Sequence, residues 1–176
     1  QGCLLAAQQC RRDDRDAIAQ KLCEQILQSQ CPQHIKLAAT RGALLTDDTI
    51  DPFRLAALVE APTQAGFAMA LIVARESPGT EVTNVIAELI EKVPAERQVL
   101  LVTAVGDRGD EGALSAVLTA TASPHESVRT AAIRSLANFQ QDTVAAKLLD
   151  MACTTDDSSS EAARNALTLT ANPTVD

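Results

Sequence analysis

The chain has 176 residues, hydrophobic residues at 46% of its positions, and a formal net charge of −8. This hydrophobic content excludes global disorder, and the excess of acidic residues argues against nucleic acid as a direct ligand, because phosphate backbones are bound through clustered Lys and Arg. Three Phe are the only aromatic residues, and apolar content rich in Ala and Leu favours an all-α protein.

The first predicted helix covers residues 2–11 and stands outside the pattern that follows it. From residue 14 onward the apolar positions repeat every 31 residues, whereas one step back from Ala39 reaches the polar Gln8, and the next turn reaches Arg12. We therefore predict an extra N-terminal helix ahead of a repeat array.

The 31-residue repeat is clearest in one column of apolar residues: Ala39, Ala70, Leu101, Ala132 and Ala163. The columns one position earlier, three later and four later are also apolar, except at Gly42 and Ser135. These offsets form one stripe of a helix with 3.6 residues per turn, whereas a strand would alternate at every second residue. The stripe predicts the second helix of each repeat, at 32–45, 63–76, 95–105, 125–138 and 158–170.

A further amphipathic helix is predicted ahead of each of these. Val82, Val85, Ile86, Leu89 and Ile90 have the i, i+3, i+4, i+7, i+8 spacing of a helix with one apolar face. Similar patterns predict helices at 14–29, 51–60, 81–92, 110–122 and 142–153. The sequence therefore predicts one α-solenoid of about five antiparallel helix pairs, with repeats near 14–46, 50–77, 80–107, 110–139 and 141–171.

Residues at the joints have the chemistry of helix ends. Gly79 and Gly109 lie between repeats, where a tight turn is expected. Four residues precede predicted helices and can accept hydrogen bonds from the first-turn N–H groups: Asp14, Thr63, Ser123 and Asp142.

The segment from Ala104 to Leu136 carries the run Val128-Arg129-Thr130-Ala131-Ala132 at the start of its second helix. This pattern resembles a HEAT repeat, a family in which two helices pair and such a run opens the second one. Other repeats depart from the arginine of this run, with Lys36, Phe67, Gln98 and Ser160 in its column. A 31-residue unit is close to the short HEAT-like repeats of bacterial proteins. The resemblance implies a curved stack of helix pairs that serves as a binding scaffold.

Residues with catalytic or metal-binding chemistry are few. The chain has two His, and it carries no Gly-rich phosphate loop and no nucleophile elbow, so we expect no enzyme activity and no cofactor. Cys23, Cys31 and His34 would supply three metal ligands, but a structural zinc site needs four. We therefore expect no metal site, and we interpret the five Cys as buried small hydrophobic residues rather than as a disulfide framework.

Two short motifs have both a functional and a structural interpretation. Arg108-Gly109-Asp110 matches a tripeptide that binds integrins, but a glycine turn followed by a capping Asp explains it better. Asp156 and Asp157 precede three Ser and suggest a cation site, but they are adjacent rather than spaced as in a calcium loop. We favour a solvated turn between helices there.

The remaining candidate site is the outward face of the second helices. Positions two before, two after and five after the central column point away from the apolar stripe, yet several are apolar. This face is either covered within the fold or receives a partner. Its candidate residues are Leu37, Arg41, Leu44, Ala68, Ile72, Arg75, Val99, Thr103 and Arg134.

These patterns favour a non-catalytic, protein-binding scaffold module. Because the sequence begins at Gln1 without an initiator Met, we expect it to be a fragment of a larger protein. The expected partners are other proteins or neighbouring domains of the parent chain. The alternative is a spacer or regulatory segment of a multidomain enzyme with its catalytic domain elsewhere. The longest apolar run, 67–74, is too short for a membrane span, and the cellular compartment stays open.

Overall fold

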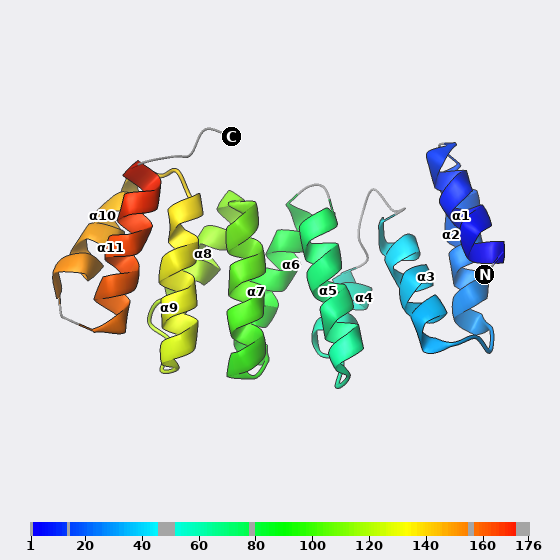
Figure 1. Cartoon of the computed structure of the whole chain (residues 1–176), viewed down its shortest axis with the longest axis horizontal. Coiled ribbons are helices and arrows are strands. Elements are labelled where there is room, and N and C mark those ends of the chain that lie inside the picture. Colours follow the sequence, from blue (N-terminus) through cyan, green and yellow to red (C-terminus); the bar gives the residue numbers. More distant parts are fainter. Residues whose placement is uncertain (1, 14, 46–51, 78–79, 155–156, 172–176) are drawn as a thin grey trace. The chain divides into compact units, whose positions relative to one another are not determined.

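The computed structural model describes residues 2–13, 15–45, 52–77, 80–154 and 157–171, and within these ranges it is all-helical with no strand (Figure 1). The prediction of an all-α fold is confirmed. Each predicted helix overlaps an observed one, with ends that differ by a few residues. The grouping of these helices into five pairs stays a prediction.

The chain divides into two compact units, residues 1–82 and 83–176. Unit 1 holds α1 (Gly2–Arg12), α2 (Asp16–Gln28), α3 (Gln33–Leu45), α4 (Pro52–Val59) and α5 (Gln64–Glu76), and the boundary falls within α6 (Glu81–Leu89). Unit 2 holds most of α6, the 3₁₀ turns η1 (Ile90–Lys92) and η2 (Leu136–Asn138), and α7 (Ala95–Arg108), α8 (Glu111–Ala120), α9 (Glu126–Ser135), α10 (Asp142–Thr154) and α11 (Ser158–Ala171). One continuous array through both units stays a prediction.

Unit 1 is built around α2 and α3, with α1 packed against both. Ala7 of α1 joins a core cluster with Cys23 and Ile26 of α2 and with Ala39 and Ala43 of α3. The α2 and α3 helices approach each other closely at Gly42. A Cβ atom on this glycine would lie 2.9 Å from the Cys23 Sγ atom, which is closer than side chains normally pack. The N-terminal helix, although outside the repeat register, thus supplies part of the core.

The helices of unit 2 lie in two neighbouring layers. In one of them α9 lies between α7 and α11 and packs against both, as Figure 1 shows. The α7 helix also packs against α8, and α10 packs against α11. The short η2 turn contacts α7, α8, α10 and α11, so its residues lie where several helices meet. Leu136 in this turn is fully buried.

The central column of the repeat forms the core in both units. Ala39, Ala70, Leu101, Ala132 and Ala163 are each 0% exposed. The neighbouring column is less regular than predicted. Leu100 is 45% exposed, because it lies at the edge of the apolar stripe.

The predicted helix ends have mixed outcomes. Thr63 caps α5 as predicted, since its hydroxyl oxygen accepts the Gly66 N–H at 3.2 Å. Ser123 is not the N-cap of α9, because the chain turns once more and His125 takes that position, its N–H bonded to the Ser123 Oγ at 3.3 Å. Asp142 is the first residue of α10 rather than the residue before it. Asp14 and Gly79 lie outside the described residues.

The prediction that the cysteines are buried is right for some of them and wrong for others. Cys10 and Cys23 are buried, and burial raises the pKa of the Cys23 thiol, so this thiol stays protonated. Cys3 and Cys153 are exposed, and Cys31 is half-buried. All five are free thiols.

Candidate functional site

Close contact between α7 and α9 positions the most prominent surface feature of unit 2. A Cβ atom on Gly106 would lie 2.4 Å from the Ser135 Cβ atom, so glycine is what allows the two helices to touch there. The Asn138 Nδ2 group donates to the Gly106 carbonyl at 3.0 Å, and the Ser135 hydroxyl donates to the Val102 carbonyl at 3.4 Å. Ser135 bonds to Val102, and Asn138, farther along the chain, bonds to Gly106, which is also farther along. The contacts therefore advance in the same direction along both segments, so α7 and α9 run parallel.

A groove of about 720 Å³ is lined by residues of these two helices. Its floor combines apolar and hydroxyl-bearing side chains, and charged side chains lie along its rim. The α7 helix supplies Val99, Thr103 and Asp107. The second wall and the end of the groove are formed by Glu126, Ser127, Thr130, Ala131, Arg134, Ser135, Asn138 and Ser158.

The groove brings together three residues of the predicted face. Val99 and Thr103 are half-buried in its floor, and Arg134 is exposed at its rim. Asp107 and Glu126 also line the groove, although neither lies at the three offsets of the predicted face. Ser127 and Ser158, which also line the groove, are separated by one 31-residue step. The repeat period therefore relates these two residues, and it is a signal by which the sequence could have identified them.

The predicted face residues of unit 1 are arranged differently. Ala68, Ile72 and Arg75 of α5 are exposed, with Ile72 at 37%, and Leu37 of α3 is half-buried. Leu44 is a correction, because it is 3% exposed and lies in the core, so the prediction that it faces outward is wrong. The buried stripe of α3 is therefore wider than the predicted one and includes Leu44.

Arg41, the remaining predicted residue, links two helices of unit 1. Its Nε group donates to the Glu76 Oε2 atom at 2.9 Å, which ties α3 to the end of α5. Arg41 also lines a polar depression of about 540 Å³ with Arg11, Arg12 and Asp16. Both groups of the ion pair are more than 40% exposed, so water screens their attraction.

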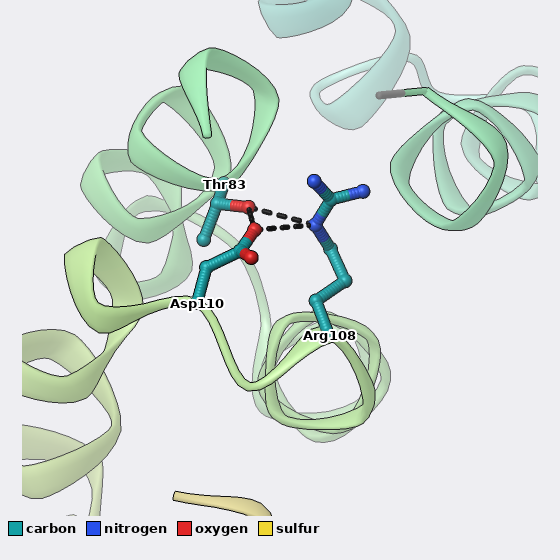
Figure 2. A network of polar contacts seen from close by, with 3 residues as sticks. All are labelled: Thr83, Arg108 and Asp110. Carbon is teal, nitrogen blue, oxygen red and sulfur yellow. Dashed lines mark hydrogen bonds and ion pairs between the residues drawn. The ribbon is translucent and has the colours of Figure 1, made fainter. Parts of the chain in front are cut away.

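The Arg108-Gly109-Asp110 tripeptide forms an internal network rather than a displayed motif (Figure 2). Gly109 ends α7 with φ +64°, a left-handed conformation that glycine adopts without strain, as the turn prediction requires. The Asp110 carboxylate is not a capping group, although the residue precedes α8. It accepts hydrogen bonds from the Thr83 hydroxyl and from the Arg108 Nε group, the latter at 2.8 Å.

This network changes the acidity of Asp110. Burial alone would raise the pKa of its carboxyl group, but the hydrogen bonds from Thr83 and Arg108 and the positive charge of Arg108 outweigh it, so the pKa is lowered. A carboxyl group with a lowered pKa in the folded state stabilises the fold above its unfolded pKa, and this contribution is lost as the pH falls through the folded value.

We therefore expect Asp110→Asn to be less stable than the parent at pH 7, with a difference that shrinks as the pH falls below about 4. Thermal unfolding followed by circular dichroism at a series of pH values measures this. Asp150→Asn is the control, because the Asp150 side chain is 70% exposed and its loss should matter little at any pH. A stability difference for Asp110→Asn that stays constant down to pH 3 would contradict the assignment.

Asp157 has a structural role at the start of α11. Its Oδ1 atom accepts the N–H groups of Ser159 and Ser160 at 3.1 and 2.9 Å, as expected for a carboxylate beside a helix N-terminus. Asp156, the other acid of this motif, lies outside the described residues. The interpretation of this segment as an inter-helix turn accounts for the contacts of Asp157.

The three residues considered as metal ligands differ in their exposure to solvent. Cys23 is buried, Cys31 is half-buried and His34 is exposed. Across the described residues, no group of three or more His, Cys, Asp or Glu is arranged to hold a metal ion. Within the same ranges, none of the helices combines the length and apolar character needed to cross a membrane.

Arg129, the second residue of the run noted in the sequence, stabilises the turn between α8 and α9. Its guanidinium group donates to the carbonyl oxygens of Ser123 and Pro124 at 2.9 and 3.1 Å. This pair of bonds gives partners to two carbonyl groups of the turn that connects α8 to α9. The arginine of the run thus has a structural role in the repeat.

Comparison with known families agrees with this architecture. The family described as HEAT repeats matches residues 82–168, about half of the chain. No curated protein and no solved structure matches the chain significantly. The all-helical architecture of the described residues and this match lead to one conclusion: residues 82–168 belong to the HEAT-repeat family.

Proposed function

We propose that this chain is a non-catalytic scaffold module of a larger protein and that it binds a protein segment in the groove along α7 and α9. One observation carries the proposal: Val99, Thr103 and Arg134, chosen from the sequence as an outward face, line one groove of about 720 Å³. HEAT repeats commonly serve as protein-interaction scaffolds, which supports the same interpretation.

The composition of the groove favours binding over catalysis. Among the residues that the structure describes, its lining contains hydroxyl groups, one guanidinium and two carboxylates, and it contains no His, Cys or Lys. General acid–base chemistry requires titratable groups that converge on a reacting atom. In this proposal the chain acts by offering the groove as a binding surface. The exposed α5 residues of unit 1, with Ile72 at their centre, form a second candidate contact surface.

Site-specific photocrosslinking tests this proposal. A benzoylphenylalanine residue in place of Thr103 lies in the groove, and the same residue in place of the exposed Ser115 of α8 lies outside it. We expect the Thr103 probe, but not the Ser115 probe, to form discrete crosslinks to protein in an extract.

A blocking variant distinguishes groove binding from incidental contact. Thr130→Arg places a long side chain in the groove and should abolish the crosslinks of the Thr103 probe, provided that circular dichroism shows an unchanged fold. Ile72→Glu, on the other unit, reports whether the α5 surface contributes. If the two probes crosslink equally, or if the blocked variant crosslinks like the parent, the chain is better described as a spacer or regulatory segment.

A further inference from the structure

We draw no further inference here: the strongest candidate, the polar depression of about 540 Å³ that Arg11, Arg12 and Arg41 line in unit 1, carries nothing, because Asp16 shares its lining, Arg41 is already bonded to Glu76, and nothing in the structure shows what would occupy it.

Discussion

Replacing Leu136 with alanine is expected to lower the free energy of unfolding by about 2–5 kcal/mol. Leu136 is 0% exposed and lies in η2, the turn that contacts α7, α8, α10 and α11. Removing most of its side chain loses buried apolar surface and leaves a cavity that four converging helices cannot easily close.

Urea unfolding followed by far-UV circular dichroism measures this change. Leu149→Ala is the matched control, because the same atoms are removed from a side chain that is 59% exposed, and we expect a change within about 0.5 kcal/mol. Equal stability of Leu136→Ala and the parent would show that η2 is not at the centre of the unit 2 core.

The second large effect is expected for Gly106→Ala, which should destabilise the protein by about 1–3 kcal/mol. In an exposed helix this substitution is favourable, because alanine has the higher helix propensity. Here the new methyl group would lie 2.4 Å from the Ser135 Cβ atom and 3.2 Å from its Cα atom. The backbone of α9 would have to move away from α7, which would also disturb the bonds of Ser135 and Asn138 to α7.

Gly112→Ala provides the comparison within the same unit. A Cβ atom on Gly112 would meet the amide end of the Asn84 side chain, which can rotate away at little cost. We expect thermal melts to show Gly112→Ala at or slightly above the stability of the parent and Gly106→Ala clearly below it. Similar melting temperatures for the two variants would refute the close approach of α7 and α9.

Much of the fold follows from the sequence, because helix formation and burial depend on local spacing. Periodicity alone predicts a buried column, and its residues are all fully buried: Ala39, Ala70, Leu101, Ala132 and Ala163. A helix repeats its faces every 3.6 residues, so one register assigns each residue to the inner or outer side. The capping of α5 by Thr63 and the left-handed turn at Gly109 were predictable for the same local reason.

The candidate site was predictable only in part. Val99, Thr103 and Arg134 were on the predicted face, and the structure places them in one groove, but the role of this groove in binding stays a prediction. Asp107 and Glu126 belong to the same groove and were missed, because a helical stripe does not show where the rim of a groove lies.

The helices, their buried stripe and the resemblance to HEAT repeats therefore all follow from the local pattern of residues. Tertiary structure decided which edges of the stripe are covered: Leu44 is buried and Leu100 is 45% exposed, although helical spacing predicts the opposite for each. It also decided that Arg108 and Asp110 bond to Thr83 and to each other rather than face solvent. These outcomes depend on how closely neighbouring helices pack, which the local spacing of a sequence pattern does not record.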